Sequence, residues 1–459
     1  MGVVNYIRKD LFNDSKFYST LARIALPIVI QNLVASSLNM VDTIMIGRVG
    51  ENELAAVGIS NQYYLLYTIL LSGLFAGCGI FISQYWGKKD LSNIKKVQGF
   101  GLLTGSVFAL IFTLLAVVFP EKIISIFNTD ATVINLGSSY LRIVGLSYFF
   151  NALTVGFSTA SRSIGNSKLP MKVSIVALII NTVLNWVFIF GNLGAPALGV
   201  TGAAIATTIA RIVECSVLIG YIYITKNELA LKVKELSGIT IAFIMNIIRT
   251  VLPTMLNDLL WVLGTTMYSI AYGRLGVQSM AAVQICTTVY NLCMVGGYGM
   301  AHSSAVIVGN EIGRGNEERA KDYSKKFAFL SILLGIILCI ILNISAPYIV
   351  TIFDVSDIVA VYARGMIAVM GINFLVKSFN LISVVGIFRG GADAKFALIL
   401  ETLTMWTIGV PLTFLAAFYF KFDIRVVYAM IIIEESVKTI PIGRRLFSFK
   451  WMKNVTLNK

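Results

Sequence analysis

Apolar stretches of about twenty residues or more recur along the whole chain, and they limit its possible folds more than any other feature. Each stretch is long enough to cross roughly 30 Å of hydrocarbon as an α-helix. Only 13% of the 459 residues are charged, far fewer than the surface of a soluble protein of this size requires. The sequence therefore predicts an all-α integral membrane protein whose solvent is the lipid bilayer.

Twelve such stretches predict twelve transmembrane helices. The five cysteines fall inside these stretches without metal-ligand spacing, so we interpret them as small apolar residues and expect no cofactor. The expected helices occupy residues 19–46, 54–84, 97–119, 134–161, 170–191, 199–224, 244–271, 280–309, 326–346, 358–388, 396–419 and 425–443.

The basic residues are distributed unevenly between the two sides of the membrane. With the N-terminus inside, 26 of the 37 lysines and arginines lie in or beside inner segments, and six lie within or near the stretches themselves. This bias follows the positive-inside rule and predicts an inner-membrane protein with both termini in the cytoplasm. It also explains the net charge of +14 without nucleic acid as a partner. The five basic residues of the outer loops are Arg48, Lys122, Arg274, Lys421 and Arg425.

The second half of the chain repeats the first. A shift of 226 residues aligns residues 26–96 with 252–322 without a gap and gives 16 identities in 71 positions, including Pro27 with Pro253. With one added residue, the register continues into RSIGNSK (162–168) and RGGADAK (389–395). The identities include glycines, prolines and charged residues, so the match is not a consequence of apolar composition.

Both copies begin inside and contain six spans, so the two repeats are parallel and related by an axis along the membrane normal. We expect a cytoplasmic N-terminal segment (1–18), an N-lobe (19–224), a cytoplasmic linker (225–243), a C-lobe (244–446) and a cytoplasmic tail (447–459). The linker is amphipathic and charged, as an interfacial segment would be.

Several segments resemble the multidrug and toxic compound extrusion (MATE) family. They are LPIVIQNLVASSLNMVDTIMIGRVGENELAAVG (26–58), its repeat in the second half, YLRI (140–143), GVTGAAIAT (199–207) and KWMKNVT (450–456), the last nearest the DinF-like branch. The resemblance implies two six-helix bundles around a central cavity. It also implies export of organic, mainly cationic or amphipathic compounds in exchange for Na⁺ or H⁺. The alternative is a flippase of lipid-linked oligosaccharides, because such flippases share the fold.

Asp42 is the most informative residue, because it is a carboxylate without a nearby cation inside the first span, where charge is costly. Five other groups are expected at a similar depth. Asn181 and Asn185 share one helix face, as do Ala203 and Thr207. With Tyr140 they form an oxygen-rich set suited to Na⁺ or to a titratable proton. The resemblance implies the same cation site: Asp42, Tyr140, Asn181, Asn185, the Ala203 carbonyl and Thr207.

The cation set departs from the resemblance at one position. Several DinF-like proteins have Asp where this chain has Asn185, so a relay of two carboxylates is not available. The sequence therefore favours Na⁺, held by Asp42, Asn181, Asn185 and Thr207, or a single proton on Asp42.

Other polar residues inside the spans are candidates for a substrate cavity or for structural ion pairs. Candidates for a substrate cavity are Gln31, Tyr64, Asp258, Lys377 and Glu401. Lys377 and Glu401 are expected either to pair with each other or to contact substrate, and Asp258 either faces a cavity or is bonded locally. Structural ion pairs are expected for Glu434 with Lys438 and for Arg211 with Glu214. Aromatic candidates for cation binding are Tyr63, Tyr64, Tyr67 and Phe149.

Pro27 and Pro253 each remove a backbone donor within a helix, which predicts a kink and, as a functional interpretation, a bending hinge. We expect a monomer in the bilayer that transports small organic cations. An enzyme is disfavoured because no HxxxH or Ser/His/Asp set is present.

Overall fold

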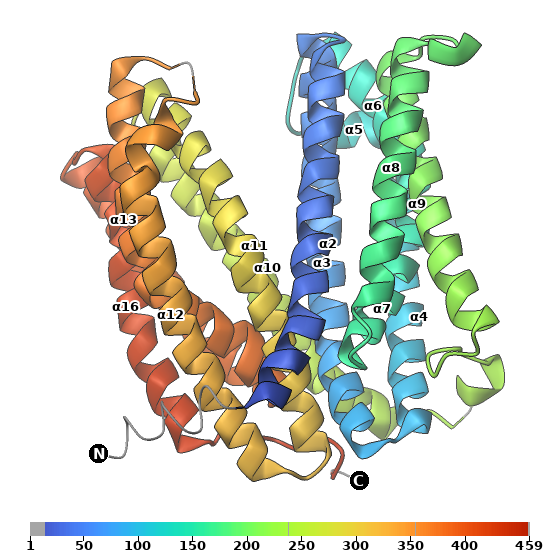
Figure 1. Cartoon of the computed structure of the whole chain (residues 1–459). Coiled ribbons are helices and arrows are strands. Elements are labelled where there is room, and N and C mark those ends of the chain that lie inside the picture. The colour runs from blue at the N-terminus through green and yellow to red at the C-terminus, as the bar shows by residue number, and fades with distance from the viewer. Residues whose placement is uncertain (1–13, 237, 354, 458–459) are drawn as a thin grey trace. The chain divides into compact units, whose positions relative to one another are not determined.

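The computed structural model describes residues 14–236, 238–353 and 355–457, and within these ranges the chain is helical with no strand (Figure 1). The predicted N-terminal segment therefore lies largely outside the described residues, as do the last two residues of the predicted tail and one position of the linker. The all-α fold class predicted from the sequence is confirmed.

Every predicted span coincides with a helix or with consecutive helical segments. The first half contains α2 (Ser15–Gly47), α3 (Glu51–Lys88), α4 (Leu91–Val118), α5 (Pro120–Ser125), α6 (Ala131–Gly145), α7 (Tyr148–Ser163), α8 (Lys168–Phe190) and α9 (Gly199–Ile224), with short 3₁₀ turns η2 (Asn192–Gly194) and η3 (Val233–Leu236). The second half contains α10 (Ile241–Gly273), α11 (Val277–Gly313), α12 (Glu317–Val350), α13 (Asp357–Leu381), α14 (Ala394–Thr404), α15 (Val410–Phe414) and α16 (Ile424–Ser448), with π-helical turns η4 (Ile382–Phe388), η5 (Met405–Gly409) and η6 (Leu415–Tyr419).

Ten helices of the described residues are long and apolar enough to cross a membrane, and α6 and α7, taken together as one bent pair, meet the same limits of length and composition. The last predicted span, on α16, is helical but does not meet the same composition limit, because it carries Glu434, Glu435 and Lys438. These three charges pair with one another or with a neighbouring helix, as described below. Their pairing lowers the cost of placing them at membrane depth.

The fourth span was predicted as one continuous helix over 134–161, and this was wrong. It is broken between Gly145 and Tyr148 with a bend of 50°. Side-chain hydroxyls bond carbonyls on both sides of the break. The Thr113 hydroxyl donates at 2.8 Å to the carbonyl of Gly145, the last residue of α6, and so satisfies an acceptor that an uninterrupted helix would satisfy itself. The Tyr67 hydroxyl donates at 2.5 Å to the carbonyl of Tyr148, the first residue of α7.

The chain packs as two units whose boundaries differ from the predicted lobes. One unit contains residues 26–255, and the other contains residues 256–459 together with the first turns of α2 up to residue 25. The division therefore falls inside α2 and α10 and not in the linker over 225–243. It lies two residues from Pro27 in α2 and two from Pro253 in α10.

Local packing explains both displaced boundaries. At the start of α2, Phe17 is buried against Phe327 of α12, with ring centroids 5.1 Å apart. The first half of α10 instead lies against α3. A Cβ on Gly73 would come within 2.6 Å of the Met255 Cα, and one on Gly77 within 2.7 Å of the Val251 Cα. The Gly73-x-x-x-Gly77 pattern thus permits a close helix–helix approach, as small residues do in membranes.

Candidate cation and substrate sites

The predicted cation set comes together in the unit formed by residues 26–255. Asp42 of α2 is half-buried and accepts a hydrogen bond at 2.5 Å from Nδ2 of Asn185 on α8. The same Nδ2 donates at 3.1 Å to Oδ1 of Asn181, one helical turn earlier. Nδ2 of Asn181 in turn donates at 3.4 Å to the hydroxyl of Thr207 on α9. Three helices therefore hold one carboxylate, two amides and a hydroxyl in a continuous chain of contacts.

Tyr140 and Ala203 complete the predicted set. Tyr140 of α6 is buried and interacts with the Thr207 hydroxyl. Ala203 is buried one turn before Thr207 on α9. Contacts thus connect five of the six predicted positions, and a role of any of them in cation binding remains a prediction.

A cavity of about 400 Å³ opens beside the cluster. Asp42, Tyr140 and Thr207 line it, together with the predicted cavity residue Tyr64. Arg211 also lines the cavity and interacts electrostatically with Asp42. We had interpreted Arg211 only as a structural ion-pair partner. Its position one turn after Thr207 on the same helix face was the sequence signal that would have placed it here.

The oxygen atoms of the cluster are suited to a hard monovalent cation. Oδ1 of Asn185 is buried, and it has no hydrogen-bond partner. Leaving such an acceptor unpaired costs about 1–3 kcal/mol, so a bound cation would gain a ligand that is otherwise unsatisfied. Within the described residues no group of three His, Cys, Asp or Glu side chains is placed to hold a metal ion. The donor set therefore fits Na⁺ or a proton on Asp42.

Gln31 does not line this cavity. Its Oε1 accepts from Arg162 at 3.0 Å, and its Nε2 donates to Ser174 at 3.2 Å. The Ser174 hydroxyl donates to Glu214 at 2.9 Å, and Glu214 forms the predicted ion pair with Arg211 at 3.0 Å. The network thus connects the C-terminal end of α7 to the cavity residue Arg211 through polar contacts. Gln31 is a structural member of that network in this conformation.

The aromatic candidates for cation binding include residues of the core as well as a residue of the cavity. Tyr67 is fully buried and stacks on Tyr148 with centroids 4.7 Å apart, and Tyr63 is buried beside Phe112. Only Tyr64 among these tyrosines lines the cavity next to Asp42. The interpretation of Tyr63 and Tyr67 as cation-binding faces was therefore wrong, because both rings are used in the core of this unit.

In the second unit, Asp258 and Glu401 belong to one polar cluster. Asp258 forms an ion pair of 2.5 Å with Arg389, whose Nη2 also donates to Oδ1 of Asn257 at 3.2 Å. Nδ2 of Asn257 donates to Glu401 at 2.6 Å. The local hydrogen-bonded alternative for Asp258 is thus the one observed. The expected partnership of Glu401 with Lys377 does not form.

Lys377 pairs instead with Glu435 of α16 at 2.6 Å. Lys438 lies 2.7 Å from Glu434 and 3.4 Å from Glu435, so the predicted Glu434–Lys438 pair is confirmed as part of a larger cluster. Asn380 donates to Glu435 at 2.7 Å. Glu434, Glu435 and Lys438 are nearly inaccessible to solvent. The two lysines and two glutamates balance in charge, which reduces the cost of burying all four.

The repeat register relates these clusters to each other. Asp42 corresponds to Tyr268, which donates a 2.5 Å hydrogen bond to Glu434. At an offset of 227 residues, Thr207 corresponds to Glu434. Each unit therefore has a carboxylate at one of these two equivalent positions. In the first repeat it is Asp42, on the first helix, and in the second repeat it is Glu434, on the last helix. The same offset also pairs Arg162 with Arg389, so an arginine–amide contact recurs at Gln31 and at Asn257 in the equivalent positions.

The fold and these clusters define a polytopic membrane protein built from two parallel six-helix repeats, with buried polar sites inside each. The MatE family model matches residues 27–187 and 253–415, one match in each repeat. The chain belongs to this family, which confirms the resemblance noted in the sequence. Assignment to the DinF-like branch remains a prediction.

The relatives extend over nearly the whole chain. An uncharacterized transporter YisQ of Bacillus subtilis is 26% identical over 93% of both chains. A probable multidrug resistance protein NorM of Thermotoga maritima is 24% identical over 99% of this chain and 97% of its own. Among solved structures, a mutant of the Vibrio cholerae MATE transporter VcmN superposes with a TM-score of 0.88 at 17% identity, covering 97% of this chain and 99% of that one. That likeness establishes the fold.

Proposed function

We propose that this protein is a secondary active antiporter that exports organic, mainly cationic or amphipathic compounds in exchange for Na⁺ or H⁺. The main support for this proposal is the Asp42 cluster, where a carboxylate and neutral oxygen ligands lie beside a cavity of about 400 Å³. Several family relatives are named as probable multidrug resistance proteins, which supports this class of substrate. The proposal includes inner-membrane insertion with both termini in the cytoplasm, and a monomer.

Asn185 has a specific role in this proposal. In the observed arrangement its NH₂ group donates to both Asp42 and Asn181, so it satisfies the carboxylate without a cation. A rotation of about 180° about χ2 would replace that donor with the unpaired Oδ1 atom. Carboxylate and amide oxygens would then face a cation together, with the hydroxyl of Thr207 nearby. A proton on Asp42 would instead neutralise the carboxylate and weaken its hydrogen bond from Asn185.

Cation binding at this site would be coupled to movement of α2. Asp42 and Pro27 lie on the same helix, and Pro27 is two residues from the boundary between the packing units. Neutralising Asp42 changes the contact between α2 and α8, and a proline nearby permits the helix to bend. Pro253 provides the equivalent position in α10. Inward movement of one positive charge yields about 2.3 kcal/mol per 100 mV, enough to bias such a cycle.

The decisive experiment measures uptake of a fluorescent organic cation into everted membrane vesicles, whose cytoplasmic face is outward, under a ΔpH or a Na⁺ gradient applied separately. Uptake driven by one of the two gradients, and abolished when that gradient is collapsed, is the expected result. Export that persists without either gradient would contradict the antiport proposal. The flippase alternative predicts transfer of lipid-linked oligosaccharide without cation export, and it requires several basic groups in the cavity. Among the residues that the structure describes, Arg211 is the single basic residue that lines the cavity beside Asp42.

A further inference from the structure

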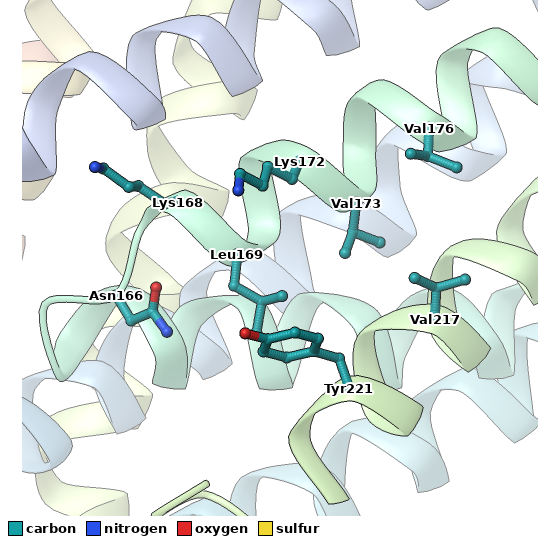
Figure 2. Close-up of a pocket in the computed structure, with 8 residues that line it drawn as sticks. All are labelled: Asn166, Lys168, Leu169, Lys172, Val173, Val176, Val217 and Tyr221. Carbon is teal, nitrogen blue, oxygen red and sulfur yellow. The ribbon is translucent and has the colours of Figure 1, made fainter. Parts of the chain in front are cut away.

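A second groove lies between the beginning of α8 and the end of α9, away from the Asp42 cavity (Figure 2). We propose that it binds an anionic phospholipid of the inner leaflet, with the headgroup phosphate at Lys168 and Lys172 and an acyl chain along the valines. The inference rests on the cytoplasmic orientation of the α7–α8 loop given under the proposed function. It does not depend on which compound is exported.

The polar end of the groove is suited to a phosphate. Lys168 and Lys172 are four residues apart at the start of α8, so they share one helix face. Both are exposed, and within the described residues neither forms a salt bridge with a carboxylate. Figure 2 shows the two lysines, the Asn166 amide and the Tyr221 hydroxyl toward one end of the groove. This end therefore offers two unpaired positive charges and two neutral polar groups.

The other end of the groove is apolar. Val176 and Val217 are each 43% exposed and lie beyond the lysines, on α8 and α9 respectively. Leu169 and Val173 are buried and form the floor. From Lys168 to Val176 the helix rises about 12 Å, which separates a headgroup level from a hydrocarbon level. A soluble anion would use only the polar end, whereas a phospholipid matches the whole groove of about 280 Å³.

Tyr221 joins the two ends. Its ring is 50% exposed and lies across the groove, while its hydroxyl points toward the polar end. Tyrosine is enriched at membrane–water interfaces because it has an apolar ring and a polar tip. The groove thus combines three features that suit the binding of an inner-leaflet lipid: basic groups at the surface, an interfacial aromatic ring and an apolar channel.

A lipid at this place would stabilise the helix pair that carries most of the cation ligands. The groove is formed by α8 and α9, and these helices also carry Asn181, Asn185 and Thr207. One residue beyond Val173, the Ser174 hydroxyl donates to Glu214 of α9 at 2.9 Å. A lipid that bridges α8 and α9 below this bond would hold the same two helices together from the inner surface.

The test measures lipid binding to the purified full-length protein in detergent, by native mass spectrometry and by thermal melting. Phosphatidylglycerol should bind at the groove and raise the melting temperature, whereas phosphatidylcholine and inorganic phosphate should do neither. Lys168→Gln/Lys172→Gln should weaken phosphatidylglycerol binding by at least about tenfold, because two lysine contacts are lost. The matched control Lys89→Gln/Lys96→Gln removes the same charge from the inner end of the same unit and should retain the binding.

A second variant keeps the inference falsifiable if the double lysine variant folds poorly. Val217→Phe fills the apolar end while leaving both lysines in place, and it should also weaken phosphatidylglycerol binding. Equal binding of phosphatidylcholine, stabilisation by inorganic phosphate alone, or an equal loss in the control pair would each overturn the inference. Because binding is measured without transport, its failure would leave the antiport proposal untouched, and loss of transport would not affect the lipid site.

Discussion

Asp42→Asn is the sharpest test of the antiport proposal, because it should abolish the coupling of export to an ion gradient and change the stability of the fold little. The asparagine keeps the shape of the side chain, and its Oδ1 can still accept the hydrogen bond that Asn185 donates to Asp42 at 2.5 Å. Only the charge on that acceptor is lost, so the cost in folding free energy should be about 1 kcal/mol, the difference between a charged and a neutral hydrogen bond.

The effect on cation binding should be much larger. A unit charge about 4 Å from a cation contributes roughly 4 kcal/mol at an effective dielectric constant of 20, which corresponds to a factor of about 10³ in affinity. The Asn181 and Asn185 oxygens cannot supply this contribution, because they are neutral. Gradient-driven efflux should therefore fall to background while the melting temperature and substrate binding stay near the wild-type values.

Asp258→Asn is the matched control, since it makes the same chemical change in the other unit. It removes the negative charge that neutralises the buried Arg389, so it should lower the yield of folded protein while the folded fraction keeps its ion dependence. Both variants are reconstituted into proteoliposomes, and efflux is measured against melting temperature. Efflux by Asp42→Asn at a near wild-type rate would refute the reasoning and move coupling to another carboxylate.

Three further predictions follow from contacts in the two units. Asn185→Ala should raise the ion concentration for half-maximal efflux without preventing folding, because it removes two contacts of the cation cluster but no charge; an unchanged apparent ion affinity would exclude it as a ligand. Glu434→Ala should cost several kcal/mol of folding free energy, because Lys377 and Lys438 would then share Glu435 as the one remaining carboxylate of their cluster. A well-folded Glu434→Gln protein without export would assign this residue to transport instead. At the start of α2, burial opposes ionisation of Asp14, but hydrogen bonds from Lys326 and the Phe17 amide lower its pKa below the usual 3.8. Its contribution to stability is therefore complete above about pH 4 and is lost as the pH falls through the lowered pKa. Asp14→Asn should therefore lower the melting temperature at neutral pH and flatten its decline on the acid side, and an unchanged melting temperature at neutral pH would contradict this role.

The sequence was sufficient to locate the helical segments and to bring together the polar residues that contact one another around Asp42, whose role in cation binding stays a prediction. Apolar length sets each span, and the i, i+4 spacing of Asn181 with Asn185 places both on one face at the depth of Asp42. Contacts between helices were less predictable, because they depend on how each helix is rotated about its axis. Lys377 pairs with Glu435 on α16, 58 residues away, and no local pattern distinguishes that partner from Glu401.

The break in the fourth span and the displaced unit boundaries have a similar cause. Gly145 can bend a helix or pack against a neighbour, and the choice depends on Thr113 of another helix, which bonds its carbonyl. In the sequence, nothing distinguishes Phe17 from its neighbours in the N-terminal segment. Its burial depends on the contact with Phe327 of α12. Tertiary packing decides both outcomes, so hydropathy and spacing alone do not determine them.

The position of the unit boundaries has a consequence for the ancestry of the chain. The first turns of α2 pack in the later unit, and residues 241–255 of α10 pack in the earlier one. Equivalent segments of the two repeats are thus exchanged, which is the pattern of a domain-swapped dimer of one six-helix protein. Gene duplication and fusion through the 225–243 segment would preserve that exchange. Two half-length polypeptides divided at this segment would each lack part of their own core, so they would have to be synthesised together to fold.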